Sequence, residues 1–267
     1  MSAETPEPTI DTSIPHNARI WNYWLGGTDN YPVDREMGEQ IRSFFPEIVD
    51  NALADREFLR RTVTHLVQNE GIRQFLDIGT GLPTGNNTHE VAQSLAPEAR
   101  VVYVDNDPLV LAHARDLLAS TEQGATDYVD ADLRSPETIL EAARTTLDLS
   151  EPVALMLLGV VNFVSDDTEV RSVLDRLLEA LAPGSYLVIS HPTDDLDPER
   201  AHQVAAAWNE RGTPKLTVRS AAGIEALFDG LELLEPGVVS CSLWRPETTE
   251  VDQIQPVSEY GGVARKG

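Results

Sequence analysis

The sequence predicts an α/β fold: a doubly wound, mostly parallel seven-stranded sheet with a C-terminal antiparallel hairpin and an N-terminal helical lid. From residue 73 onward, short β-branched runs alternate with helical stretches of about ten to twenty residues, as in βαβ units. The 267 residues, 41% of them hydrophobic, suffice for one large domain without metal or disulfide staples. The single cysteine, Cys241, excludes an internal disulfide and is interpreted as a small buried hydrophobe.

The chain divides into three predicted segments. Residues 1–14 are polar, acidic and proline-containing, so we expect them to be disordered or loosely attached. Residues 15–70 are helical in character, are interrupted by Gly26-Gly27, and form the predicted lid or cap. Residues 71–267 form the predicted α/β core.

The strands are identified by the segments between them. Asp107-Pro108, Ser135-Pro136 and Asp197-Pro198 each place a capping side chain before a proline at the first helical position. The last two strands are joined only by Pro236-Gly237, which is too short for a parallel crossover, so they should form an antiparallel hairpin. The predicted strands are 73–78, 100–105, 126–130, 152–158, 185–190, 231–235 and 238–244.

The charge of the chain narrows the classes of partner. A formal net charge of −24, without any run of lysines or arginines, disfavours nucleic acid and anionic membrane surfaces. The longest apolar stretch, 153–164, is too short to span a bilayer. The N-terminus is the reverse of a signal peptide, so we expect a cytoplasmic protein.

A glycine loop follows the first predicted strand. Gly79-Thr80-Gly81 allows the backbone to turn sharply and to approach a ligand closely. A dinucleotide fingerprint would need a glycine at position 84, where Thr84 stands, and the next helix is expected only from about Thr88. A pyrophosphate needs a helix N-terminus beside the turn. S-adenosylmethionine has no phosphate, so the pattern favours it over a nicotinamide dinucleotide.

Acidic residues end the next two strands. Asp105 ends the second strand and is predicted to accept both ribose hydroxyls, whereas Asp107 is better explained as a helix cap. Asp132, after the third strand, is predicted to accept a hydrogen bond from the adenine amino group, with Leu133 packed on the ring. The alternatives are a solvated loop carboxylate for Asp105 and helix capping or surface charge for Asp132.

The segment Asp77-Ile78-Gly79-Thr80-Gly81 and the acidic residues that follow the second and third strands resemble the class I, Rossmann-like S-adenosylmethionine-dependent methyltransferases. Over nearly its whole length the chain is similar to one actinobacterial family of S-adenosyl methyltransferases, long described only as a domain of unknown function. The resemblance implies that 71–267 is a Rossmann-like methyltransferase core, with S-adenosylmethionine as cofactor and S-adenosylhomocysteine as product. The acceptor stays open. The most specific blocks are 15–27, 29–32, 75–84 and 102–108.

The sequence departs from the wider superfamily at two places. Pro83 stands where the glycine loop often carries a third glycine. Leu158-Gly159-Val160 stands where enzymes that methylate amino nitrogens in nucleic acids carry an Asn/Asp-Pro-Pro-Tyr signature. The second departure agrees with the charge and favours a small-molecule acceptor.

The segment 16–31 is dense in aromatic and polar residues. It reads either as an amphipathic helix packed on the sheet or as a lid hinged at Gly26-Gly27. In the second interpretation Arg19 and Tyr23 point into the site, and Arg19 meets a carboxylate of the cofactor or of the acceptor.

A base is needed only if the acceptor must lose a proton. His191, just after the fifth strand, is the predicted base; its alternative role is a hydrogen bond within a loop. Asn162 is predicted to orient the acceptor or to contact the cofactor's amino acid end. No metal site is predicted. The predicted cofactor residues are Asp77, Gly79, Thr80, Gly81, Asp105, Asn106, Asp132, Leu133 and Gly159, and the predicted lid and substrate residues are His16, Arg19, Tyr23, Asn30 and Asn162.

Methyl transfer to a small molecule is therefore the leading hypothesis. A non-catalytic S-adenosylmethionine sensor or scaffold is the alternative, and a nicotinamide oxidoreductase is a third. The sequence does not indicate the oligomeric state.

Overall fold

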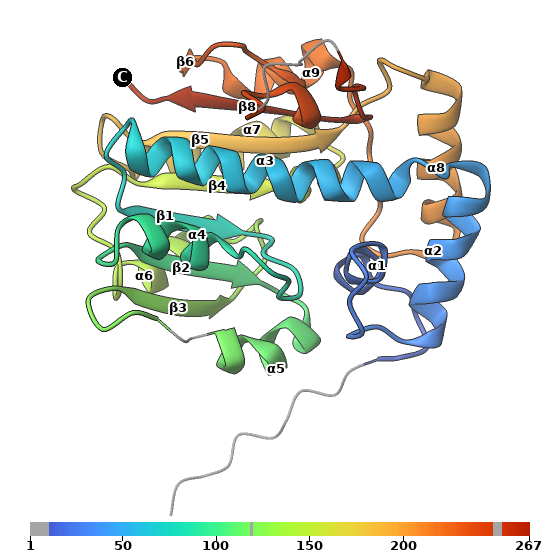
Figure 1. The fold of residues 1–267 in the computed structure, drawn as a ribbon, viewed down its shortest axis with the longest axis horizontal. Coiled ribbons are helices and arrows are strands. Elements are labelled where there is room, and N and C mark those ends of the chain that lie inside the picture. Colours follow the sequence, from blue (N-terminus) through green and yellow to red (C-terminus); the bar gives the residue numbers. More distant parts are fainter. Residues whose placement is uncertain (1–10, 118–119, 248–252) are drawn as a thin grey trace, which may run out of the picture.

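The computed structural model describes residues 11–117, 120–247 and 253–267, and these build one eight-stranded sheet with helices on both faces (Figure 1). The strand order is β3-β2-β1-β4-β5-β8-β6, with β7 paired to β8. The predicted mostly parallel α/β sheet is therefore confirmed. The five parallel strands are β1 (Gln74–Ile78), β2 (Arg100–Asp105), β3 (Ala125–Asp130), β4 (Ala154–Leu158) and β5 (Tyr186–Pro192).

The helices follow the boundaries that the capping signals indicate. Asn87 and Glu90 form a capping box at the start of α4, and Asp197 caps α8 through a hydrogen bond from the Arg200 N–H. The helices are α1 (Asn17–Trp24), α2 (Pro32–Phe44), α3 (Ile48–Gln68), α4 (Thr88–Leu95), α5 (Pro108–Leu117), α6 (Pro136–Ala143), α7 (Asp167–Glu179), α8 (Pro198–Arg211) and α9 (Ala221–Glu225).

Each face of the sheet buries its own apolar layer because side chains alternate along a strand. On β1, Leu76 and Ile78 pack with residues of α6, α7 and α9, whereas Phe75 packs with residues of α3 and α4. Every residue of β1 is buried, as expected for a strand covered on both faces. This doubly wound arrangement brings the carboxyl ends of all five parallel strands to one edge.

The antiparallel end of the sheet differs in detail from the prediction. The segments β6 (Glu232–Leu233) and β7 (Val239–Ser240) do not pair with each other as a hairpin; both pair with β8 (Glu259–Arg265), which also lies antiparallel to β5. The sequence did not indicate β8 because it carries Gly261 and Gly262, which are poor strand formers. Packing requires the first of them, since a Cβ at Gly261 would lie 2.7 Å from a ring carbon of Phe58.

The cap over the carboxyl edge of the sheet is built from α1, α2 and α8 (Figure 1). Ile20, Ile41 and Trp208 share one apolar cluster that joins these three helices. The helix α3 contributes to both parts: Ile48 lies in this cap cluster, whereas Phe58 and Leu66 belong to the core layer on the sheet. The division near residue 70 stays a prediction.

The N-terminal segment predicted to be disordered lies largely outside the described residues, which begin at residue 11; residues 11–14 are exposed. Among the described helices, none combines the length and the apolarity that crossing a membrane requires.

Candidate cofactor and acceptor site

A cavity of about 1020 Å³ lies between the carboxyl edge of the parallel strands and the cap. Drug-sized ligands occupy pockets of roughly 300–1,000 Å³, so this one has room for two small molecules side by side. The cavity brings together all nine residues predicted to hold the cofactor, together with two of the five predicted lid and substrate residues, His16 and Asn162.

The glycine loop leaves β1 in a conformation that only glycine adopts easily. Gly79 and Gly81 have φ values of 79° and 66°, and a Cβ at Gly79 would lie 2.5 Å from Val160 Cβ. The N–H groups of Gly79 and Thr80 both donate to the carbonyl of Val104. The loop is therefore held against both neighbouring strand ends, and a Cβ at Gly81 would meet only open space.

The Asp105 carboxylate organises the end of β2. Its Oδ2 accepts the Gly81 N–H at 2.8 Å, and its Oδ1 accepts the N–H groups of Asn106 and Asp107 at 2.8 and 2.9 Å. A carboxylate offers about four lone-pair sites, so three are occupied and one on Oδ2 remains. In this conformation Asp105 can accept one ribose hydroxyl rather than both.

Asp77 lies at the centre of the site and is buried. Its Oδ2 accepts a 2.6 Å hydrogen bond from the hydroxyl of Thr88, the first residue of α4. Burial raises the pKa of Asp77 to about 6, against a partial lowering by that hydrogen bond. A buried carboxyl without a cationic partner suits the positive end of an amino acid ligand.

The residues predicted to bind adenine lie together in the cavity lining. Asn106 Nδ2 donates to Asp132 Oδ2 at 2.9 Å, and Asp132 Oδ1 accepts the Arg134 N–H at 2.8 Å. Leu133 is buried in the core layer while it also lines the cavity. The geometry gives this part of the cavity an apolar wall beside hydrogen-bonding groups, as a purine requires.

The end of β4 contributes an open backbone turn and an unsatisfied amide. Gly159 has φ 59°, and a Cβ there would meet nothing within 4 Å. Its N–H donates to the Ser190 hydroxyl and carbonyl oxygen. Asn162 is 4% exposed, and its side-chain Oδ1 has no protein partner. A buried acceptor without a partner is costly unless a ligand satisfies it.

The donor set fits S-adenosylmethionine and does not fit a dinucleotide. Three carboxylates, Asp77, Asp105 and Asp132, line the cavity and would repel a pyrophosphate. The N-terminus of α4 is also occupied, because the Glu90 side chain accepts the Asn87 N–H at 2.7 Å. The same carboxylates suit a ligand with a positive sulfur, an ammonium and sugar hydroxyls.

His191 is not positioned to act as a base. It is fully buried and does not line the cavity. Because arginine can only donate, the 2.6 Å contact from Arg219 makes Nε2 an acceptor, which leaves Nδ1–H to donate to the Pro192 carbonyl at 2.8 Å. Burial lowers the pKa of His191 to about 3. His191 therefore makes structural hydrogen bonds, as in the alternative interpretation, but within strand β5 and to the distant Arg219 rather than within a loop.

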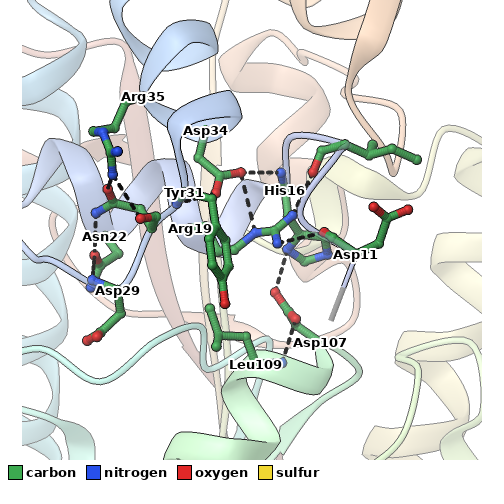
Figure 2. A network of polar contacts seen from close by, with 12 residues as sticks. Asp11, His16, Arg19, Asn22, Asp29, Tyr31, Asp34, Arg35, Asp107 and Leu109 are labelled. Carbon is green, nitrogen blue, oxygen red and sulfur yellow. Dashed lines mark hydrogen bonds and ion pairs between the residues drawn. The ribbon is translucent and has the colours of Figure 1, made fainter. Parts of the chain in front are cut away.

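Arg19 does not line the cavity either. Figure 2 shows it within a network of polar contacts that includes Asp34 and Asp11. Its guanidinium is buried, donates to the carbonyls of Asp11 and Ile14, and lies 3.3 Å from Asp34 Oδ1. The ring of Tyr31 lies 5.4 Å from its central carbon. Arg19 therefore anchors the cap through these contacts and does not line the cavity.

Two further lid predictions are corrected in the same way. The Tyr23 hydroxyl donates to Glu39 at 2.6 Å, between α1 and α2. The Asn30 amide donates to Asn22 and to the Gly27 carbonyl. Neither residue lines the cavity.

His16, by contrast, lies between the cap and the core. It lines the cavity and places Nδ1 2.7 Å from Asp107 Oδ2 (Figure 2). Asp107 also caps α5 by accepting the Leu109 N–H, as the sequence indicated.

Two buried carboxyls in the cavity wall were missed. Asp55 lies on α3 and Glu259 on β8, and both line the cavity. For Asp55 a signal existed, because it lies on the same helical face as Leu59 and thus places an acid among apolar residues. For Glu259 there was none, since β8 was not predicted.

Comparison with known proteins places this site in a family. A family model described as S-adenosyl methyltransferase matches residues 3–267. A DUF574 family protein from Streptomyces avermitilis has 46% identity and a TM-score of 0.93, covering 97% of this chain and 100% of that one. A crystal structure described as a methyltransferase from Thermobifida fusca has 40% identity and a TM-score of 0.90, covering 99% of both chains.

Curated relatives are more distant. Trans-aconitate 2-methyltransferase of Escherichia coli O1:K1 is 26% identical over 181 residues, which are 67% of this chain. The match spans only 61% of that relative's own length.

Proposed function

The chain belongs to the S-adenosyl methyltransferase family, and we propose that it transfers the methyl group of S-adenosylmethionine to a small molecule bound beneath the cap. One observation carries this: a single cavity joins the glycine loop and Asp105 at one end to an apolar cap at the other. No observation on the described residues favours the non-catalytic alternative.

The residues of β1, β2 and β3 would hold the cofactor. The backbone of 79–81 and the Asp77 carboxyl would face its amino acid end, Asp105 would accept a ribose hydroxyl, and Asp132 with Leu133 would hold adenine. When bound, the cofactor supplies a methyl group on a positively charged sulfur, which is already activated for displacement.

The protein's own contribution is placement. Holding an acceptor in line at near-attack distance supplies much of the rate enhancement. The cap cluster of α1, α2 and α8 excludes water from that position. Asn162 Oδ1, buried and without a partner, can orient a donor group of the acceptor.

We further propose that the acceptor is neither nucleic acid nor a membrane component. The net charge of −24 supports this. The single cysteine, Cys241, is free and buried, which agrees with our proposal of a cytoplasmic location.

Calorimetry with S-adenosylhomocysteine and with NAD tests the cofactor. We expect S-adenosylhomocysteine to bind in the micromolar range, about −8 kcal/mol, and NAD not to bind. Turnover of S-adenosylmethionine with a panel of small acceptors then separates an enzyme from a sensor. The proposal is contradicted if the folded protein binds neither S-adenosylmethionine nor S-adenosylhomocysteine, or if it binds NAD more tightly than either.

A further inference from the structure

The wall of the cavity also carries an acid pair, Asp55 and Glu259. Asp55 lies near enough to Asp77 for its charge to add to burial in raising the pKa of Asp77. Figure 1 shows α3 running across the front of the sheet. On β8, Glu259 and Gly261 point to the same face, and Phe58 of α3 packs against Gly261. Asp55 precedes Phe58 by about one helical turn, so it lies over the Glu259 end of β8.

Both carboxyls are buried in an unusual way. Asp55 is 5% exposed and Glu259 is 3% exposed, and Asp55 Oδ1 and Glu259 Oε1 each lack a hydrogen-bond partner. Among the described residues, no lysine, arginine or histidine forms an ion pair with either. Unpaired buried acids are rare because burial of a charge costs several kcal/mol.

The charge of Asp55 also acts on Glu259. Burial and the neighbouring Asp55 charge raise the pKa of Glu259 well above its usual value, and burial raises the pKa of Asp55 to about 6. Two close carboxyls cannot both ionise easily, so the pair retains a proton. A ligand that brings a positive charge would satisfy both unpartnered oxygens at once.

The place of Glu259 in the sheet points to the acceptor. The predicted cofactor residues come from the ends of β1 to β4, whereas Glu259 pairs opposite Pro192 of β5, farther along the sheet. The same cavity then continues into an apolar wall from the cap. That wall includes Trp21, Trp24, Phe45, Phe163, Trp208 and Leu216.

We propose that the methyl acceptor is an amine on an apolar body, bound as an ammonium between Asp55 and Glu259, with its body against the aromatic residues of the cap. This rests on the proposed function. An ammonium has up to three N–H donors, which match two carboxylate oxygens and the Asn162 amide oxygen. One N–H proton can pass to a carboxylate oxygen of the pair, which leaves the nitrogen lone pair free. That lone pair would form the new N–C bond to the methyl group as the S–C bond breaks, with S-adenosylhomocysteine as the leaving group.

A divalent cation is a poorer occupant. Among the described residues, no group of three or more His, Cys, Asp or Glu side chains is arranged to hold a metal ion. Two carboxylates against an apolar wall match an organic ammonium better than a hydrated metal ion.

The test compares three probes of equal shape on the complex with S-adenosylhomocysteine: 2-phenylethylammonium, 2-phenylethanol and phenylacetate. We expect the ammonium to bind at least about tenfold more tightly than the alcohol, and phenylacetate to bind most weakly. The preference should fall to within about threefold in the Asp55→Asn, Glu259→Gln double variant. Both changes keep side-chain shape, and thermal melting confirms folding.

The matched control is Glu57→Gln, which removes one negative charge from an exposed position of the same helix. It should retain the ammonium preference. Equal binding of ammonium and alcohol to the wild type, or a preference that survives in the double variant, overturns the inference.

The affinity for S-adenosylhomocysteine separates this inference from the proposed function. We expect the double variant to bind it within about twofold of the wild type. A loss of about tenfold or more would assign the pair to the cofactor's ammonium and overturn the inference. Wild type that does not bind the cofactor at all contradicts the proposed function, and probe binding to the free protein then still decides whether the pair is a cation site.

Discussion

The backbone N–H of Gly81 donates a 2.8 Å hydrogen bond to Asp105 Oδ2, which ties the turn after β1 to the end of β2. One carboxylate thus has two tasks: it holds the glycine turn in its left-handed conformation and keeps one lone-pair site for a ligand hydroxyl. Changes at either residue should therefore affect cofactor binding.

Asp105→Ala should weaken S-adenosylhomocysteine binding by at least about tenfold, or about 1.4 kcal/mol. The variant loses the ligand acceptor and leaves the Gly81 N–H without its partner. Calorimetry measures the change. Asp130→Ala, at the exposed end of the next strand and outside the cavity lining, should bind as the wild type does. Equal affinities of wild type and Asp105→Ala would remove Asp105 from the site.

Gly81→Ala and Gly71→Ala form a second matched pair. Both glycines have positive φ, 66° and 73°, and at both a Cβ would meet nothing within 4 Å. Each substitution should lower the free energy of unfolding by about 1–2 kcal/mol through backbone strain. Only Gly81→Ala should weaken S-adenosylhomocysteine binding, by about threefold to tenfold, because Gly71 lies outside the cavity. Similar affinities for both variants would mean that the loop does not contact the cofactor.

Arg19→Met should destabilise the cap. The change leaves the carboxylate of Asp34, which is fully buried, without its cation, at a cost of about 3–5 kcal/mol. The backbone amides of His16 and Tyr31 both donate to Asp34, so faster hydrogen exchange at these two amides measures the loss of cap stability. Arg35→Met, at an exposed position nearby, should change stability by less than about 0.5 kcal/mol. A stable Arg19→Met variant that loses only cofactor affinity would instead restore the ligand-binding role that the sequence suggested.

The stability of the protein should fall as pH rises through the range of the buried acids. The pKa of Asp55 is about 6 in the folded protein, above its usual 3.8, so the folded state binds more protons between these values. The free energy of unfolding therefore decreases from about pH 4 to about pH 6, by at most about 3 kcal/mol for this group. Asp55→Asn should remove that decrease and be more stable, relative to wild type, at pH 7.5 than at pH 4.5.

Urea unfolding at the two pH values measures this difference. Glu57→Gln, on the exposed side of the same helix, should differ from wild type equally at both. An Asp55→Asn profile parallel to that of the wild type would show that Asp55 is ionised without penalty in the folded state.

The local patterns of the sequence indicated which residues line the cavity at the carboxyl edge of the sheet. The glycine loop, Asp105 and Asp132 each follow a strand directly, and the carboxyl ends of parallel strands share one edge, so their meeting required no knowledge of distant contacts. The sequence also indicated the starts of α5, α6 and α8. Asp107 and Asp197 cap α5 and α8 through contacts between residues close in the chain, whereas α6 begins at Pro136 without a capping hydrogen bond from Ser135.

The local sequence did not predict the roles of the lid residues and of His191. The sequence shows that Arg19 and His191 carry donors and acceptors, but not which partners occupy them. In the fold, Arg19 donates to two nearby carbonyls and forms an ion pair with Asp34. Both ring nitrogens of His191 are occupied, by Arg219 and by the Pro192 carbonyl.

Local sequence patterns were thus sufficient to indicate the family, the parallel sheet and the edge where the candidate cofactor residues meet, since these depend on local backbone conformation and strand order. The part of the cavity that we propose for the acceptor depends on contacts made only in the folded chain. There, β8 pairs with β5, α8 completes the cap, and α3 lays Asp55 beside the Glu259 end of β8. Residues far apart in the chain meet there because the folded core brings together elements that share no sequence pattern. The free energy of their packing depends on all of these elements together and cannot be calculated from each segment separately.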